Sequence, residues 1–324
     1  MLKYWLKATV FSFLYLFTLI TFGQRIDNTA SFRSVADDNY IRFHYDNDFF
    51  RKTDYYYTQG YQLEIAAPIF RKNPVTKLLL QLKEGQKYGL AFEHYGFTPT
   101  SIRSDQILYG DRPFAGIIML KSFAISVNSE RRERLASTLS TGMIGPVAFA
   151  GRMQATIHRW SGDVVPHGWQ YQIGNDLVIN YEVSHEKELL NAANLFSLYS
   201  LVRANLGTLS DRAQAGVVMK AGKFDSVFGK SAKKNAKTFQ LYAYYQPLGG
   251  LVGYDATLQG GVFNKNNPYT LQANQLNRLT FQNGFGVVAN FWKIYLEYSQ
   301  TFVSKEFKSG EKHSWGGVKM GYSF

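Results

Sequence analysis

The chain has 324 residues and no cysteine. Disulfide-stapled scaffolds, cysteine-ligated zinc sites and cysteine nucleophiles are therefore excluded. Charged residues make up only 19% of the chain, whereas hydrophobic residues make up 45% and aromatic residues 16%. Because this much apolar and aromatic side chain can bury a core or face lipid, the composition excludes a disordered protein.

Several short catalytic motifs are also missing. The sequence has no Gly-x-Ser-x-Gly elbow, no His-Glu-x-x-His helix and no phosphate-binding glycine loop. No Pro-rich or Ser-rich linker interrupts the chain and no long repeat is visible, so no internal domain boundary is expected. Function must therefore be inferred from dispersed polar residues.

The N-terminus has the pattern of a secretory signal peptide. Residues 1–7 carry two lysines, residues 8–22 are apolar and uncharged, and Gly23 precedes a polar residue. This order is typical of a cleaved signal. The alternative is a membrane anchor, because the same stretch could nearly span a bilayer. We expect a signal peptide at residues 1–23 and an exported mature chain at residues 24–324.

The rest of the chain repeatedly alternates between apolar and polar residues with a period of two. Large apolar and aromatic side chains share one face, and charged, amide or hydroxyl side chains share the other. The clearest examples are residues 61–67, 177–184, 293–302 and 318–324. Period-two alternation indicates β-strands with two different faces.

Two architectures produce such strands. A soluble β-sandwich packs its apolar face on a second sheet, whereas a transmembrane barrel turns that face to lipid and the other to a polar lumen. The Tyr-rich and Phe-rich apolar face suits membrane interfaces, and the C-terminal Phe324 resembles the last strand of outer-membrane barrels. We therefore predict an all-β, transmembrane antiparallel β-barrel of about 12 strands in the bacterial outer membrane.

Three stretches fit this pattern less clearly. Residues 130–134 form a short charged run that we interpret as a solvated turn between two strands. Residues 230–237 hold four basic side chains and are expected to form a loop. Residues 186–202 are compatible with a short helix or with a turn that leads into a strand.

The segment 40–50 is unusually rich in ionisable groups for a barrel strand. Alternation turns its aromatic residues outward and its polar ones, Arg42, His44, Asp46 and Asp48, inward. It would leave Asn47 outward, so a bulge or the strand end is expected there. Two carboxylates on one face can hold Ca²⁺, which prefers oxygen ligands. The alternative is a lattice of salt bridges in the lumen.

Further polar residues follow downstream. Thr58 supplies a hydroxyl in the segment 54–60, and Asp111 and Arg112 can pair through a bidentate fork or simply shape a turn. The segment 154–181 contains His158 with acidic residues nearby. A histidine near an acid is suited to act as a base that activates water.

Taken in order, these segments resemble the outer-membrane lipid A 3′-O-deacylases, the LpxR family. The resemblance extends from about residue 40 to the C-terminus. It rests on Tyr45-Asp46-Asn47-Asp48-Phe49, Tyr57-Thr58-Gln59-Gly60, Asp111-Arg112-Pro113-Phe114-Ala115-Gly116, Gln154 with His158, Gly168-Trp169, Asn205-Leu206-Gly207 and Asp255 to Gly260.

The resemblance implies a twelve-stranded barrel that hydrolyses the ester-linked 3′ acyloxyacyl chain of lipid A with the help of Ca²⁺. Asn47 and Asp48 correspond to the family's Asn-Asp pair, and His158 to its catalytic histidine. His158 would activate water, and Ca²⁺ near Asp48 would stabilise the oxyanion. Asp46 is expected as a further metal ligand.

Other roles follow less directly from the resemblance. We expect Thr58, Asp111 and Arg112 to support the site or bind substrate. Asp163, or alternatively Asp176, is expected to assist His158. The expected partners are lipid A or lipopolysaccharide and the outer membrane, with no nucleic acid and a monomeric state. The net charge of +12 suits a phosphorylated substrate. The alternatives are a non-catalytic barrel of the same fold and a narrow pore.

Overall fold

The computed structural model describes residues 28–35, 37–51, 55–229 and 239–324. The predicted signal peptide at 1–23 and the basic stretch 230–237 lie outside these residues. None of the helices within the described ranges is long and apolar enough to cross a membrane.

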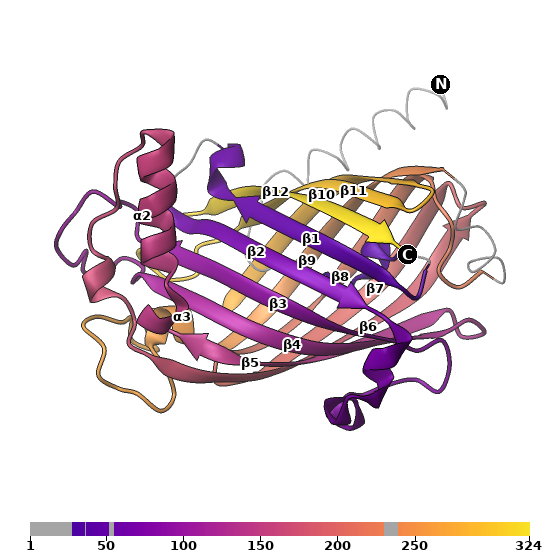
Figure 1. Cartoon of the computed structure of the whole chain (residues 1–324), viewed down its shortest axis with the longest axis horizontal. Helices are drawn as coiled ribbons and strands as arrows, with labels where there is room; N and C mark the ends of the chain where they lie inside the picture. The colour runs from indigo at the N-terminus through magenta and orange to yellow at the C-terminus, as the bar shows by residue number, and fades with distance from the viewer. Residues whose placement is uncertain (1–27, 36, 52–54, 230–238) are drawn as a thin grey trace, which may run out of the picture.

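The described residues form twelve β-strands that close into one barrel (Figure 1). Each strand pairs antiparallel with its neighbours in the chain, and β1 pairs with β12 to close the sheet. The strands are β1 (Tyr40–Asn47), β2 (Tyr56–Ala66), β3 (Lys87–Thr98), β4 (Ala115–Asn128), β5 (Glu133–Ile144), β6 (Asp176–Ala192), β7 (Phe196–Gly207), β8 (Ser210–Lys223), β9 (Gln240–Asp255), β10 (Leu279–Phe291), β11 (Ile294–Val303) and β12 (His313–Ser323). The predicted fold class and strand number are confirmed.

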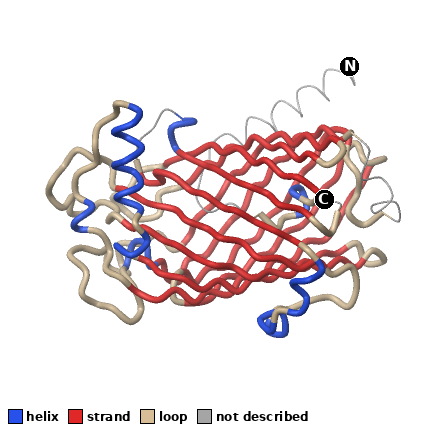
Figure 2. Tube along the Cα trace, viewed as in Figure 1, coloured by secondary structure: helices blue, strands red, loops and turns tan. Residues whose placement is uncertain are grey.

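Helices are confined to the two ends of the barrel (Figure 2). The α-helices of the described residues are α2 (Ala150–Ser161) and α3 (Ala256–Gln259). The short 3₁₀ helices are η2 (Ser31–Arg33), η3 (Asp48–Arg51), η4 (Pro68–Lys72), η5 (Pro74–Leu78), η6 (Pro146–Ala148) and η7 (Trp169–Tyr171). We call the end that carries α2 and the connections 99–114, 145–175 and 256–278 the loop end. The opposite end, which carries Phe324, is the terminal end.

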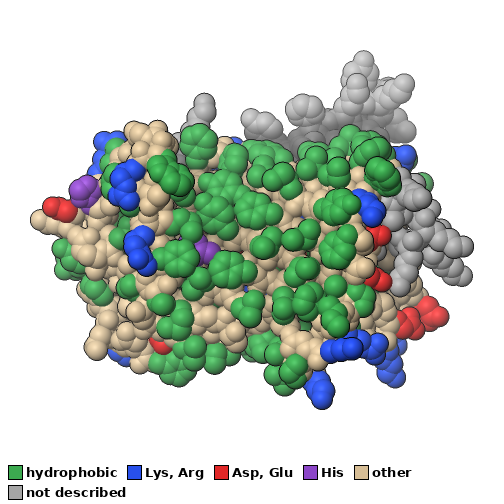
Figure 3. Space-filling view, viewed as in Figure 1, with side chains coloured by type: hydrophobic (Ala, Val, Ile, Leu, Met, Phe, Trp, Pro, Cys, Tyr) green, Lys and Arg blue, Asp and Glu red, His purple; other side chains and the backbone are tan. Residues whose placement is uncertain are grey.

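The two faces of the strands separate as the alternation predicts. In β1, Arg42 and His44 are buried inside the barrel, whereas Ile41 and Phe43 are exposed on its outer surface. Figure 3 shows hydrophobic side chains covering much of this outer surface. An apolar outer band around a polar interior is the arrangement of a transmembrane barrel.

Two of the three uncertain stretches prove to be hairpins. β4 ends at Asn128 and β5 begins at Glu133, which confirms a turn at the charged run. Residues 186–202 belong to the β6–β7 hairpin, whose turn contains Ala193 and Asn194 with φ of 51° and 57°. The helical alternative for this stretch is therefore wrong, because the alternation of β6 continues to the turn.

The lumen is filled from the terminal end by the described N-terminal segment. The Arg33 guanidinium lies 2.8 Å from the Glu297 carboxylate of β11, and the Phe32 ring stacks on Tyr244 of β9 at 4.0 Å. The Ser31 amide donates to Glu186 of β6 at 2.9 Å. Residues 28–33 are all buried, so the segment closes this end of the barrel.

The loop end of the lumen is closed by Arg112. Its guanidinium pairs with Glu306, donates to the Thr257 hydroxyl at 2.6 Å and lies 3.9 Å from the centre of the Phe97 ring. Between the two closures lies a cavity of about 70 Å³, room for only a few water molecules. Side chains of the described residues therefore pack across the lumen near both of its ends.

Candidate active site

Helix α2 stands against the outer wall of the barrel at the loop end (Figure 1). Small residues permit this close approach. A Cβ on Gly116 of β4 would lie 2.7 Å from the Ala150 Cβ, and a Cβ on Gly151 would lie 2.7 Å from Trp169 Cγ. The helix ends at Ser161, because Gly162 adopts φ of 75° and its amide donates to the His158 carbonyl.

The wall beneath α2 differs from the apolar surface around it. Thr58 sits in β2 where the pairing with β3 shifts register. Its hydroxyl accepts a hydrogen bond from the Gln154 amide at 2.8 Å, and the Gln154 oxygen accepts one from the Trp169 indole at 2.7 Å. All three residues are buried. This chain of hydrogen bonds joins β2, α2 and η7 into one unit.

His158 lies one helical turn after Gln154, so both side chains project from the same side of α2. The His158 Nδ1 atom lies 2.6 Å from the Val164 carbonyl oxygen. A carbonyl can only accept, so Nδ1 must carry the proton and Nε2 of the neutral ring has a lone pair. No hydrogen bond to another described residue occupies Nε2. The half-buried ring is thus oriented for proton acceptance at Nε2.

The acidic residues expected near His158 have other roles in the described structure. The Asp163 carboxylate is exposed and accepts from the Val164 amide at 2.7 Å. Its own amide donates to the His158 carbonyl at 2.9 Å. Asp176 accepts from the amides of Phe263 and Asn264 at 2.7 and 3.0 Å, which holds the 256–278 loop. The His158 ring is therefore oriented by a backbone carbonyl, and Asp163 shapes the turn that presents it.

A groove with a volume of about 640 Å³ opens between α2 and the barrel wall. Apolar and aromatic side chains dominate its lining, with one guanidinium among them. The lining residues are Tyr61, Phe149, Arg152, Met153, Thr156, Ile157 and Trp160. Its shape and chemistry suit a hydrocarbon chain that carries a polar or anionic head.

Asn47 and Asp48 mark the end of β1, as expected from the break in alternation. The Asn47 amide donates to the Tyr45 hydroxyl at 3.0 Å and accepts from the Phe49 amide at 2.7 Å. Asp48 is buried and accepts from the Tyr55 amide at 2.7 Å. Burial and the nearby carboxylates of Glu311 and Asp48 raise the pKa of the Tyr55 phenol above its usual value.

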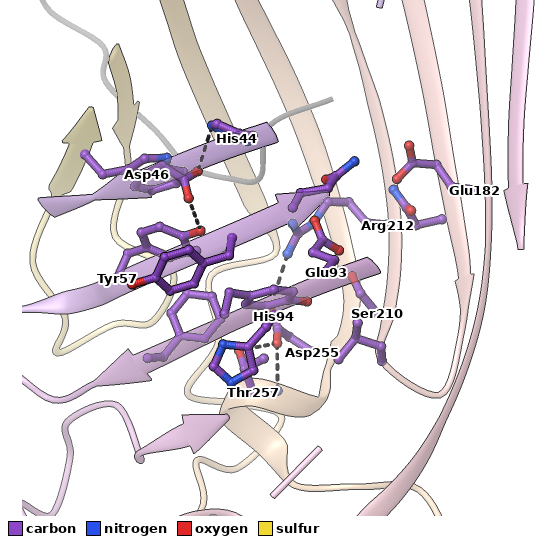
Figure 4. A pocket seen from close by; sticks show the side chains of 18 of the residues that line it. His44, Asp46, Tyr57, Glu93, His94, Glu182, Ser210, Arg212, Asp255 and Thr257 are labelled. Atoms are coloured by element: carbon purple, nitrogen blue, oxygen red, sulfur yellow. Dashed lines mark hydrogen bonds and ion pairs between the residues drawn. The ribbon is translucent and has the colours of Figure 1, made fainter. Parts of the chain in front are cut away.

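Asp46 points into the lumen (Figure 4). Its carboxylate accepts from the Tyr57 hydroxyl at 2.8 Å and lies 3.5 Å from His44 Nε2. Gly60 lies close to this carboxylate: a Cβ there would be 2.3 Å from the Asp46 oxygen, so a larger residue would require Asp46 to shift. Within the described ranges, no three His, Asp or Glu side chains are grouped to hold a metal. These residues alone supply fewer oxygen ligands than Ca²⁺ usually takes.

Asp111 and Arg112 do not form the bidentate pair that the sequence suggested. The Asp111 carboxylate accepts from the amide and hydroxyl of Thr100 at 2.8 and 2.5 Å, within the 99–114 loop. Arg112 turns inward to Glu306 and Thr257 instead. Adjacent side chains in an extended segment point in different directions. Asp111 therefore binds within its own loop, whereas Arg112 binds residues of other loops.

Two residues at the α2 wall had no role assigned from the sequence. Gln154 links Thr58 to Trp169, and its spacing of four from His158 is the signal that places both on one helix face. Gln59 is also buried, and its side-chain nitrogen has no hydrogen-bond partner among the described residues. A buried donor without a partner is a candidate for binding a substrate oxygen.

Comparison with a solved structure supports the fold, and a second, more distant barrel is also similar in part. LpxR from Salmonella typhimurium superposes with a TM-score of 0.72 and 17% identity, covering 88% of this chain and 100% of that one. The β domain of the Bordetella autotransporter BrkA gives a TM-score of 0.44 and 10% identity, over 88% and 99% of the two chains. No curated protein sequence matches the chain.

A family model described as outer membrane protein LpxR matches residues 10–324, nearly the whole chain. This match places the barrel in the outer membrane. In such barrels the longer loops face the exterior, so the loop end with α2 is extracellular and the terminal end is periplasmic. The ordered motifs, the closed barrel and the family model agree, and the chain belongs to the LpxR family of outer-membrane proteins.

Proposed function

We propose that this protein is a hydrolase that removes the ester-linked 3′ acyloxyacyl chain from lipid A. One observation carries the proposal: His158 is oriented by the Val164 carbonyl, with no described residue hydrogen-bonded to Nε2, on the helix whose neighbouring residues line a groove against the barrel wall. The groove lies at the extracellular end, where the outer leaflet contains lipid A. A soluble substrate would not need a site that opens toward lipid.

The proposed chemistry is hydrolysis by activated water. His158 Nε2 accepts a proton from water, whose oxygen bonds to the ester carbonyl carbon. The tetrahedral intermediate then collapses as the bond to the sugar oxygen breaks, and His158 returns the proton to that oxygen. The products are a free fatty acid and an alcohol on lipid A. Water is the nucleophile, so an acyl-enzyme is not required.

The remaining residues support this step in different ways. Thr58 and Gln154 position α2, and thereby His158, against the wall. The apolar groove would hold the acyl chain, while Arg152 at its edge would face a phosphate or sugar. Asn47 would orient substrate. Asp163 shapes the turn at Val164.

The Ca²⁺ requirement rests on the family resemblance. Asp48 is the carboxylate that would contribute to holding the ion, since Asp46 is engaged by Tyr57 in the lumen. When bound, the ion would polarise the ester carbonyl. Asp111 and Arg112 support the extracellular loops in this proposal. A monomer is sufficient, because the site is built from one chain.

The test is mass spectrometry of lipid A from cells that express the protein, with Ca²⁺ or with a chelator. The native protein should remove one acyloxyacyl unit in the presence of Ca²⁺. His158→Ala should remove none, whereas His167→Ala, an exposed histidine in the next loop, should retain activity. Unchanged lipid A in every condition, with the barrel folded in the membrane, would contradict the proposal and favour a non-catalytic barrel.

The pore alternative has its own test. Because residues 28–33 and Arg112 fill the two ends of the lumen, single-channel recordings should stay at baseline. A steady conductance from the native barrel would support a channel instead.

A further inference from the structure

The connection between β2 and β3 is a segment on the outside of the barrel at the periplasmic end. We call residues 68–82 the strap; it contains η4 and η5 and lies at the lower right in Figure 1. The Tyr181 hydroxyl of β6 donates to the Leu78 carbonyl and accepts from the Leu80 amide, both at 2.9 Å. The Ser137 hydroxyl of β5 donates to the Leu80 carbonyl at 2.7 Å. The strap is thus fixed to the wall.

The part of β4 beneath the strap carries small residues on its outer face. Ser122, Ala124 and Ser126 alternate with lumen-facing residues of β4, and all three are buried under the strap. Leu120, two positions before Ser122 on the same face, is 54% exposed. The Ser126 hydroxyl accepts from the Leu82 amide at 2.8 Å. The strap thus covers hydroxyls that would otherwise face lipid.

The side of the strap that faces away from the wall is apolar. Ile69, Leu78 and Leu80 are 60%, 64% and 56% exposed, whereas Leu79 packs inward against Tyr88. Three large aliphatic side chains on a short segment would be unfavourable in water.

Basic residues accompany the apolar ones. Arg71, Lys72, Lys77 and Lys83 are exposed, and Glu84 is the acidic residue near them in the sequence. Apolar and basic side chains together are typical of segments that lie in a membrane interface, where hydrocarbon and anionic headgroups meet.

We propose that the strap is an interfacial anchor that binds anionic glycerophospholipids in the periplasmic leaflet. Ile69, Leu78 and Leu80 insert among the acyl chains, and Arg71, Lys72 and Lys77 bind the headgroup phosphates. These exposed apolar side chains lie on the outside of a barrel of the outer membrane, beside basic residues, which favours lipid over a protein partner. The proposal concerns the opposite end of the barrel from His158 and does not depend on deacylase activity.

The absence of cysteine makes the insertion directly testable. A nitroxide is attached to Leu78→Cys, and to Phe263→Cys in the extracellular 256–278 loop as the control, since both positions are 64% exposed. In phosphatidylethanolamine–phosphatidylglycerol vesicles, the label at position 78 should collide more with oxygen than with a water-soluble nickel complex. The label at position 263 should show the reverse. Water-like access at position 78 would overturn the insertion, and Leu80→Cys serves as a second label site if the first variant does not fold.

The headgroup preference is tested with the lipids that co-purify with the full-length barrel. In the triple variant Arg71→Gln, Lys72→Gln and Lys77→Gln, the ratio of co-purified phosphatidylglycerol to phosphatidylethanolamine should fall by about fivefold or more. The reason is that one basic group near an anionic surface contributes about fivefold to binding. The matched triple Lys305→Gln, Lys308→Gln and Lys312→Gln, exposed at the extracellular end, should keep it. Folding is checked by heat-modifiable gel mobility. An unchanged preference in the strap variant would overturn headgroup binding.

Discussion

The inner and outer faces of the barrel wall both carry polar residues, but the two sets differ in what their atoms contact. Inside, Arg33 pairs with Glu297 and Arg42 with Glu64, at 2.8 and 2.9 Å. Outside, on α2, one ring nitrogen of His158 is held by Val164 and the other has no hydrogen-bond partner among the described residues. The dense set of charges in the lumen therefore holds the interior of the barrel together and need not mark a reactive site. His158 differs because its ring is only half-buried, so that a substrate can reach it.

The largest expected effect is on the inner face. Glu297→Ala would leave Arg33 and Lys319 buried without their shared carboxylate, and should lower the free energy of unfolding by about 3–5 kcal/mol. Urea unfolding in lipid vesicles measures this change. Activity per folded molecule should stay near the native value, and Glu311→Ala, an exposed carboxylate, is the control. A native-like unfolding curve for Glu297→Ala would show that the lumen pairs do not stabilise the barrel.

The next largest effect is expected where α2 packs on β4. Gly116→Leu would place a side chain where Ala150 lies, since even a Cβ there comes within 2.7 Å. Displacing His158 by about 1 Å should lower the deacylation rate by about 100-fold while the barrel stays folded. The rate is measured on purified lipid A in detergent. Gly253→Leu, where a Cβ has ordinary contacts of 3.4 Å, should leave the rate unchanged; equal losses in both variants would point to a general folding defect.

A smaller loss is expected from Gln154→Leu. The substitution keeps the bulk but leaves the Thr58 hydroxyl and the Trp169 indole without their buried partner. The cost of about 1–3 kcal/mol should appear mainly in kcat, with a decrease of about tenfold. Thr58→Val should behave similarly, and the double variant should lose little more than either single one. Additive losses would indicate that the two residues act separately.

The smallest effect is expected from Asp163→Asn. Its carboxylate accepts from the Val164 amide and does not contact the His158 ring, so the rate should change less than about threefold. Loss of a carboxylate that orients a catalytic histidine directly can instead cost about 10⁴-fold. Steady-state kinetics on lipid A distinguishes the two. A loss of that size would overturn the assignment of Val164 as the group that orients His158.

Much of the fold was predictable because strand faces follow directly from the order of residues. The alternation at residues 40–47 predicted which side chains of β1 enter the lumen, and Arg42, His44 and Asp46 are buried there. The β6–β7 hairpin was less clear, since residues 186–202 have no Gly or Pro to mark the turn. The short helix α2 was not predicted, because its residues follow a Gly-Pro pair in a long polar segment.

The candidate site was predictable only in its parts. Motif order indicated His158, Asn47, Asp48 and Thr58, but nothing in the sequence separated a metal site from a salt-bridge network in β1. The structure brings Asp46 to Tyr57, and Thr58 to Gln154, which lies 96 residues away. Arg112 likewise pairs with Glu306 across the barrel mouth rather than with the adjacent Asp111.

The sequence by itself determined the barrel, its two faces and the order of its motifs, because period-two alternation depends only on residues next to one another. The tertiary structure decided which polar groups are partners and which atoms, such as His158 Nε2 and Gln59 Nε2, have no partner among the described residues. It packed α2 on Gly116, turned the Val164 carbonyl to His158 and set the strap over Ser122 and Ser126. Such contacts join segments that are distant in the chain, and closure of the barrel is what brings them together.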